Sequence, residues 1–398
     1  MQAIDSAPYM EEGNGSIPTG ARVALVHDFL LDLRGAERVF AAICDTWPGA
    51  DVFTAVYDER GTDGRFANRD VNTSFLQRLR PTASTFRPLL PLYPYAVESF
   101  DLSGYDLVIS SSSAWAHGVI VDERAAHVCY CYNPVRYAWS ERETTLSSRS
   151  PLLRAGLRWV FNRWRQWDWI AAQRVDTYVA VSELTRRRIK RYYGREATVL
   201  HPAVETSRFA PGPVGDYYLV VSELMFHKRI EVAIEAFNRL RLPLVVVGDG
   251  PETRRLRRLA GPTIRFEGRT SDARVAQLMQ GAKALIVTAA EEFGIAAVEA
   301  QAAGRPVIAL AEGGACETVV EGETGVFYEG SDPTALAETV AAFDPLAFDP
   351  ADCVEQARRF DIAGFREGLQ RVVSDALAEP RVERPPRRMR RRPARLRA

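Results

Sequence analysis

Short apolar strand patterns alternate with amphipathic helix patterns along this chain, and this alternation restricts the fold more than any other feature. Buried strands are expected at residues 22–26, 50–56, 105–110, 127–131, 175–181, 197–200, 217–221, 242–247, 263–267, 284–287 and 306–310. Strands that alternate with helices form parallel sheets with helices on both faces. The sequence therefore predicts an α/β protein with two doubly wound, Rossmann-like domains that face a cleft.

One of these strand-loop-helix units holds two carboxylates at a defined spacing. After the strand at 284–287 the chain reads EEFGIAAVEAQAAGR from Glu291, and Glu299 follows eight residues later. We expect a helix from Gly294 to Gly304, whose unpaired N–H groups and dipole suit an anion such as a diphosphate. The carboxylates suit sugar and ribose hydroxyls. An ordinary buried unit with two surface glutamates fits the spacing equally well.

The same residues carry a family resemblance. The pair Glu291 and Glu299 resembles the E-x7-E signature of the retaining, GT-B-fold glycosyltransferases of family 4. The likeness continues through RPVIALAEGGACETVVEGETGVFY at 305–328 and extends more weakly over about residues 20–375. It implies a GT-B architecture in which Glu291 meets the transferred sugar and Glu299 the nucleotide ribose. Phe293, Gly294 and Ile295 between them are expected to help bind the donor.

Within that family the chain looks most like enzymes that add mannose from GDP-mannose to bacterial surface polysaccharides. The resemblance implies a retaining hexosyltransferase that uses a nucleotide sugar and a glycan or lipid-linked glycan acceptor. Proline and glycine cluster around residues 202–213, where apolar periodicity lapses. The expected parts are a disordered lead at 1–20, an acceptor-side domain at 21–205, a hinge at 206–215, a donor domain at 216–362, a helix crossing back at 363–379 and a basic disordered tail at 380–398.

A second informative stretch is SELMFHKR, residues 222–229. It resembles an R-L-x-x-x-K segment whose arginine and lysine grip the donor diphosphate in the family. Lys228 matches the lysine, and we predict that it acts with Glu291 in catalysis; the alternative is an exposed lysine at a helix start. Glu223 stands where the arginine is common, and a carboxylate beside a diphosphate is repulsive unless it turns away. The neighbouring Arg229 is the expected substitute for the missing arginine. Arg269 follows a strand at the place where the family recognises the base of the nucleotide.

The acceptor-side candidates are polar side chains near the ends of strands in the first half. They are His27, Asp28, His117, Tyr132 and Arg136. The resembling enzymes often have a histidine at the position of Tyr132, so a ring nitrogen is missing there. For His117 the alternative is a structural role. The loop after the first strand is expected to meet the donor through Gly35, although the family often has two glycines there.

Several classes of site are disfavoured. No GxGxxG follows the first strand, which argues against a dinucleotide oxidoreductase. No Asp-x-Asp follows a strand in a metal-holding context, and the five cysteines show no metal spacing. We therefore expect no metal and no cofactor. Two other functions stay open: a sugar-nucleotide epimerase on the same fold, and a non-catalytic partner in polysaccharide assembly, which Glu223 and Tyr132 motivate.

Composition indicates the setting. The chain has no 18-residue apolar run, and its first 20 residues are polar and acidic, unlike a signal peptide. An odd, scattered set of cysteines is typical of a reducing cytoplasm. We expect a cytoplasmic protein, peripheral on the inner face of the cell membrane.

Basic segments give the reason for expecting a membrane partner. Residues 381–398 hold nine arginines and one glutamate, and residues 75–100 and 151–170 mix aromatic with basic side chains. Basic aromatic segments can lie on anionic membranes. The alternative for 151–170 is that its four tryptophans pack inside the first domain. No base-reading fold accompanies the arginine tail, so no specific nucleic-acid partner is expected.

Overall fold

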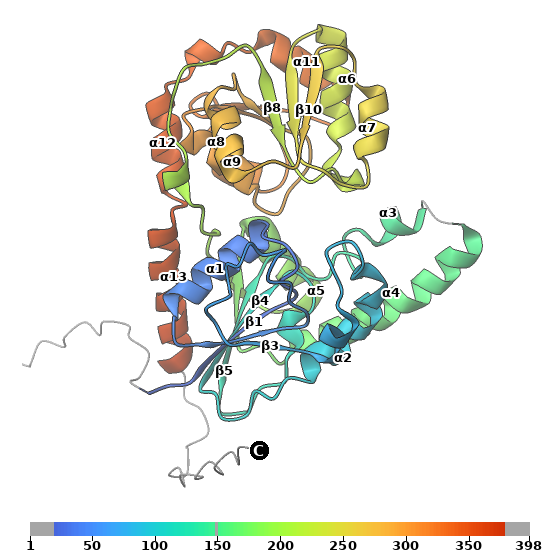
Figure 1. The fold of residues 1–398 in the computed structure, drawn as a ribbon, viewed down its shortest axis with the longest axis vertical. Coiled ribbons are helices and arrows are strands. Elements are labelled where there is room, and N and C mark those ends of the chain that lie inside the picture. The colour runs from blue at the N-terminus through green and yellow to red at the C-terminus, as the bar shows by residue number, and fades with distance from the viewer. Residues whose placement is uncertain (1–19, 148–149, 379–398) are drawn as a thin grey trace, which may run out of the picture.

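The computed structural model describes residues 20–147 and 150–378. They form two α/β domains stacked one above the other (Figure 1). The predicted tail at 380–398, and the predicted lead at 1–20 apart from Gly20, lie outside the described residues. Two doubly wound domains are confirmed.

The first sheet is parallel throughout and has the strand order β3-β2-β1-β4-β5-β6-β7. Its strands are β1 Val23–His27, β2 Asp51–Thr54, β3 Val71–Thr73, β4 Leu107–Ser112, β5 Ala126–Cys131, β6 Thr177–Ala180 and β7 Ala197–Val199. Side chains alternate between its two faces: Leu25 packs into one core, and Ala24 and Val26 pack into the other. Both faces are thus covered, as a parallel sheet requires.

The second sheet repeats this plan with the strand order β10-β9-β8-β11-β12-β13. Its strands are β8 Tyr218–Val221, β9 Leu244–Val247, β10 Ile264–Gly268, β11 Leu285–Val287, β12 Val307–Leu310 and β13 Gly325–Tyr328. In each sheet the order reverses beside the first strand, at β1/β4 and at β8/β11. Ligands bind at such switch points, outside the carboxyl ends of the strands.

Helices cover both faces of each sheet. They are α1 Gly35–Thr46, α2 Tyr93–Glu98, α3 Arg142–Ser147, α4 Pro151–Ala172, α5 Glu183–Tyr193, α6 Ile230–Leu240, α7 Thr253–Leu259, α8 Asp272–Gln280, α9 Ile295–Ala302, α10 Ala315–Thr318, α11 Pro333–Ala342, α12 Pro350–Arg358 and α13 Ile362–Ala378. Short 3-10 turns are η1 Phe75–Leu79, η2 Arg87–Leu92, η3 Ala116–Gly118, η4 Thr206–Arg208, η5 Phe226–Lys228 and η6 Pro345–Ala347. The side chains of Ser182 and Asp332 cap α5 and α11.

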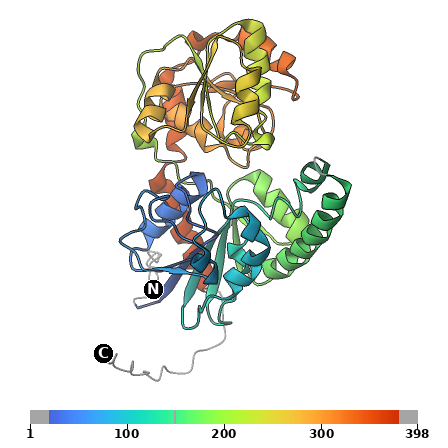
Figure 2. The same ribbon diagram turned by 45° about the vertical axis from the view of Figure 1, so that its right-hand side comes forward.

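The last helix returns to the first domain. Phe365, Leu369 and Val373 of α13 are buried in the core that also holds α1 and one face of the first sheet. Figures 1 and 2 show α13 running along the first domain, while α12 sits on the second.

The chain changes domain earlier than the predicted hinge at 206–215. Ala203 packs in the first-domain core, whereas Val204 and Phe209 pack in a second-domain core. The side chain of Gln280 donates to the carbonyl oxygens at 210 and 211, so the predicted hinge is fixed to the second domain. The prediction was wrong because proline and glycine here mark an ordered surface loop.

The two aromatic, basic segments are only partly buried. In α4, Trp164 is buried and Trp167 donates its ring N–H to Glu98 at 2.9 Å, but Trp159 and Trp169 are exposed. The segment at 75–100 contributes Tyr93 and Val97 of α2 to the same first-domain core. No helix in the described part of the chain is long and apolar enough to cross a membrane.

Candidate active site

A cavity with a volume of 1060 Å³ lies between the two domains. It is lined by the loops that follow strands of both sheets. The main lining segments are 32–36 after β1, Ser222 and Glu223 after β8, 248–251 after β9, 269–272 after β10 and 291–296 after β11. The cavity therefore joins the switch points of the two sheets, where this topology places ligands.

The N-terminus of α9 opens into this cavity. Gly294 caps the helix with a φ of +88°, a conformation that glycine adopts without cost. The loop before it rests directly on the Gly-rich turn after β12, because a Cβ on Gly314 would lie 2.2 Å from the Cα of Phe293. The Gly314 N–H also donates to the Glu291 carbonyl oxygen at 2.8 Å. These contacts fix the helix start, where residues 294–296 line the cavity and their N–H groups have no acceptor within the helix.

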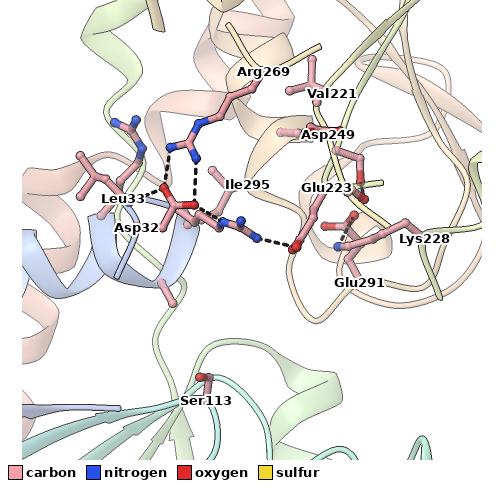
Figure 3. A pocket seen from close by; sticks show the side chains of 18 of the residues that line it. Asp32, Leu33, Ser113, Val221, Glu223, Lys228, Asp249, Arg269, Glu291 and Ile295 are labelled. Carbon is pink, nitrogen blue, oxygen red and sulfur yellow. Dashed lines mark hydrogen bonds and ion pairs between the residues drawn. The ribbon is translucent and has the colours of Figure 1, made fainter. Parts of the chain in front are cut away.

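Lys228 and Glu291 meet at this helix start. Their Nζ and Oε1 atoms are 2.8 Å apart, and both residues line the cavity (Figure 3). The backbone of Lys228 is held by Thr288, whose hydroxyl donates to the Lys228 carbonyl oxygen at 2.7 Å. The structure thus brings the two predicted catalytic residues together, with Phe293, Gly294 and Ile295 beside them.

Glu299 lies outside this cavity. It lines a smaller cavity of 350 Å³ beside α1 and η4, where its Oε1 is 3.9 Å from a guanidinium nitrogen of Arg208. Burial raises the pKa of Glu299 to about 7, although Arg208 and Arg38 act to lower it. Ile295 lines both cavities, so the two spaces are neighbours.

The other donor-side candidates divide into two groups. Arg269 and Gly35 line the main cavity, and a Cβ on Gly35 would lie 3.2 Å from Cδ1 of Ile295, so Gly35 permits close approach of the domains. Arg229 instead has a left-handed backbone and donates to the Ser331 carbonyl oxygen at 3.0 Å. It is absent from the cavity lining, so the predicted substitution of Arg229 for the missing arginine was wrong.

Two acceptor-side candidates line the cavity. Arg136 reaches Glu292 of the second domain at 3.0 Å. Tyr132 lies at the cavity wall, but its hydroxyl is engaged with the Ser111 hydroxyl and the Ala36 carbonyl oxygen, each at 3.0 Å. Tyr132 therefore fixes the start of α1.

Three acceptor-side candidates are internal and do not line the cavity. His27 is buried, stacks on Phe40 and lies 3.1 Å from the Ser111 hydroxyl. His117 is buried against Asp168, at 3.1 Å, and this carboxylate helps to raise the pKa of His117 against the effect of burial.

The third internal candidate, Asp28, is fully buried and accepts hydrogen bonds from residues 113–116. Placing these three residues in the site was wrong, because their side chains are buried and contact polar groups inside the first domain.

Sequence reasoning missed the second glutamate of the doublet at 291–292. Glu292 is held by Arg136 at 3.0 Å, Arg188 at 3.1 Å and Asn133 at 3.3 Å, all from the first domain. Burial acts to raise the pKa of Glu292, but these arginines and Lys228 lower it overall. The sequence offered one sign of this residue, the pair of adjacent glutamates at 291–292. It did not show the partners of Glu292, because they lie more than 100 residues away along the chain.

Charged side chains of the loop after β1 were also missed. Asp32 pairs with Arg269, and Arg34 pairs with Glu223 across the cavity at 2.5 Å (Figure 3). Glu223 thus turns toward a cation of the opposite domain. Within residues 20–147 and 150–378, no cluster of three His, Cys, Asp or Glu side chains is placed to hold a metal ion.

Sequence models of glycosyltransferases match two consecutive parts of the chain. The model described as Glycosyltransferase Family 4 matches residues 33–208, and that described as Glycosyl transferases group 1 matches residues 207–360. The chain belongs to glycosyltransferase family 4. The recognition made from the Glu291–Glu299 spacing is confirmed.

Relatives of this family 4 chain carry related names. A D-inositol 3-phosphate glycosyltransferase of Acidothermus cellulolyticus is 31% identical over 56% of this chain and 54% of its own length. A GDP-mannose-dependent α-(1-6)-phosphatidylinositol monomannoside mannosyltransferase of Mycolicibacterium smegmatis is 32% identical over 44% of this chain and 54% of its own length. The chain thus spans about half the length of these curated relatives.

Solved structures show the same fold. The Anabaena protein HepE, crystallised with UDP, superposes with a TM-score of 0.66 at 18% identity, covering 89% of this chain and all of that one. The predicted GT-B architecture is thereby confirmed.

Proposed function

We propose that this family 4 chain is a retaining glycosyltransferase. It moves a hexose from a nucleotide sugar to a glycan or lipid-linked glycan in cell-surface polysaccharide biosynthesis. The observation that carries the proposal is the meeting of Lys228, Glu291 and the α9 N-terminus in one cavity between the domains. A cation and oriented N–H groups suit a diphosphate, and the carboxylate suits sugar hydroxyls.

The arrangement supports a division of roles during transfer. The bond between the anomeric carbon and the diphosphate oxygen breaks while the acceptor oxygen attacks from the same face, which retains the configuration. The leaving phosphate oxygen takes the acceptor proton. Lys228 and the N–H groups at 294–296 stabilise the negative charge that develops on the diphosphate. Because these groups supply the positive potential, we propose transfer without a metal ion.

GDP-mannose is the donor that we propose. The resemblance of the chain to mannose-transferring enzymes supports it, as does the M. smegmatis relative, whose name specifies GDP-mannose. Arg269, which follows β10 at the cavity wall, is the proposed contact for the base.

Calorimetric titration with GDP, UDP and ADP, first without metal and then with Mg²⁺, tests the donor site. We expect GDP to bind selectively without metal. Selective binding of UDP would replace the donor but keep the transferase. If none of the three bound, the chain would instead be a non-catalytic partner. Incubation with GDP-mannose alone tests the remaining alternative, since an epimerase would convert the sugar without an acceptor.

We also propose that the first domain rests on an anionic membrane through α4. Leu152 is 90% exposed and Trp159 is 65% exposed, and the guanidinium of Arg163 lies 5.6 Å from the Trp159 ring centroid. Exposed apolar and basic groups together suit an anionic lipid surface. Trp159→Ser is expected to weaken co-sedimentation with anionic vesicles, whereas Leu346→Ser, at an even more exposed apolar site on the second domain, is the control. Equal sedimentation of Trp159→Ser and wild type would exclude this surface.

A further inference from the structure

A chain of charges crosses the main cavity from one domain to the other. Arg269 of the second domain donates to Asp32 of the first at 3.0 Å, and Asp32 accepts from Nε of Arg34 at 2.8 Å. Nη1 of Arg34 then reaches Oε1 of Glu223, back on the second domain, at 2.5 Å. Figure 3 shows these contacts as a continuous line, and its last member, Glu223, lines the same cavity as the Lys228–Glu291 pair.

Arg34 is held firmly within this chain. It precedes the first turn of α1, where Glu37 accepts a hydrogen bond from the Arg34 backbone N–H at 3.1 Å. Its guanidinium is fixed at two points, by Asp32 and by Glu223. The side chain nevertheless remains 47% exposed and lines the cavity, so further N–H donors are available to a ligand.

The negative charge of Glu223 is unfavourable in an anion-binding site unless a cation such as Arg34 neutralises it. It lines the same cavity as Lys228 and the α9 N-terminus, where its negative charge opposes a diphosphate. Lys228 is itself paired with Glu291, so its positive charge is partly offset at this point. Arg34 both neutralises Glu223 and brings a guanidinium, which matches phosphate oxygens in geometry, to the cavity.

We propose that Arg34 is a second diphosphate-binding cation, supplied by the first domain and aimed by Glu223 and Asp32. This inference rests on the proposed function, and it deepens it: the donor site is complete only when the two domains meet. Donor binding and domain closure are then coupled, because the same guanidinium serves both.

The test is titration of Arg34→Gln with GDP and with GMP. We expect at least a tenfold loss of affinity for GDP and a smaller loss for GMP, which lacks the second phosphate. Arg255→Gln is the matched control, since Arg255 is 44% exposed and pairs with two carboxylates, Glu231 and Glu252, outside the cavity. It is expected to bind as wild type does.

Two double variants separate phosphate binding from simple charge neutralisation. Arg34→Gln with Glu223→Arg returns a guanidinium from the other side of the cavity and is expected to recover most of the GDP affinity. Arg34→Gln with Glu223→Gln removes both charges and is expected to stay weak. Full recovery by the second pair would show that Arg34 only neutralises Glu223, and would overturn the proposal.

The remaining outcomes distinguish this inference from the proposed function. If Arg34→Gln bound GDP with wild-type affinity, the proposed role of Arg34 would be rejected, but the proposed transferase function would be unaffected. Equal losses for GDP and GMP would place Arg34 away from the second phosphate and would also reject the proposal. If the wild-type chain bound no nucleoside diphosphate, both would fall. Unchanged melting temperatures confirm that the variants are folded.

Discussion

Asp28→Ala is expected to destabilise the first domain rather than to remove a substrate contact. The Asp28 carboxylate is fully buried. Its Oδ1 accepts from the N–H groups of Trp115 and Ala116, both at 2.6 Å, and its Oδ2 accepts from Ser113 N at 2.6 Å, Ser113 Oγ at 2.7 Å and Ala114 N at 3.0 Å. Asp28 therefore folds the loop that follows β4.

The size of the effect follows from these contacts. Hydrogen bonds to a charged group contribute about 1.5–3 kcal/mol each, and a buried donor left unpaired costs about 1–3 kcal/mol. These contributions do not add fully, because the loop relaxes once the carboxylate is removed, and breaking a buried charged network costs about 3–5 kcal/mol. We expect about 4 kcal/mol, which lowers the melting temperature of a domain of this size by about 8–16 °C.

Differential scanning calorimetry of Asp28→Ala and Asp28→Asn measures this loss. The melting temperature of Asp28→Asn should lie between those of Asp28→Ala and wild type. Its carbonyl oxygen can still accept hydrogen bonds, but its NH₂ group faces N–H and O–H donors and cannot accept from them. Asp32→Ala is the matched control, since Asp32 lies in the same loop but pairs with side chains in the cavity. If Asp28→Ala melted as wild type does and yet failed to bind donor, Asp28 would be a site residue and the reasoning would be refuted.

Three further predictions concern the site and the fold. Lys228→Ala and Glu291→Gln should each abolish transfer while stability changes by no more than about 1–2 kcal/mol; normal turnover would remove that residue from the site. Burial raises the pKa of Glu299 from 4.5 to about 7, so its contribution to stability is fully present below pH 4.5 and is lost as the pH rises through 7, by up to about 3 kcal/mol. Glu299→Gln should abolish this loss when the free energy of unfolding is measured by denaturant titration at each pH. Parallel pH profiles of this free energy in the variant and the wild type would contradict the prediction. Leu369 of α13 is buried, so Leu369→Ala should destabilise the first domain by about 2–5 kcal/mol. Arg371→Ala, at an exposed position of the same helix, is the control and should leave stability unchanged. An unchanged melting transition of the first domain in Leu369→Ala would refute this prediction.

The fold was predictable because strands of a buried parallel sheet are local, continuous apolar runs. The segment at 244–247, LVVV, is such a run, and the structure has β9 there. The edge strand β3, VNT, was not predicted, since it is three residues long and partly exposed and so leaves no apolar pattern. Similarly, the start of α9 at Gly294 was readable, because the sequence around a helix start determines its capping locally.

The members of the site were harder to predict than its place. Polar residues after a strand end, such as Asp28 and His117, look like cavity residues in sequence. Whether they face the cavity or a buried backbone depends on packing, and here they satisfy buried groups. The sequence likewise does not show that Glu292 meets Arg136 and Arg188, since these contacts form only when the domains approach.

By itself the sequence determined two doubly wound domains, the family, and the helix start beside Glu291. Those features depend on local apolar periodicity, on capping and on a motif of fixed spacing. Only the tertiary structure decided that Glu223 faces Arg34 and that Glu299 lies in a neighbouring cavity. The physical reason is that electrostatic pairing depends on distance in space, and residues 34 and 223 are brought together by the packing of two domains.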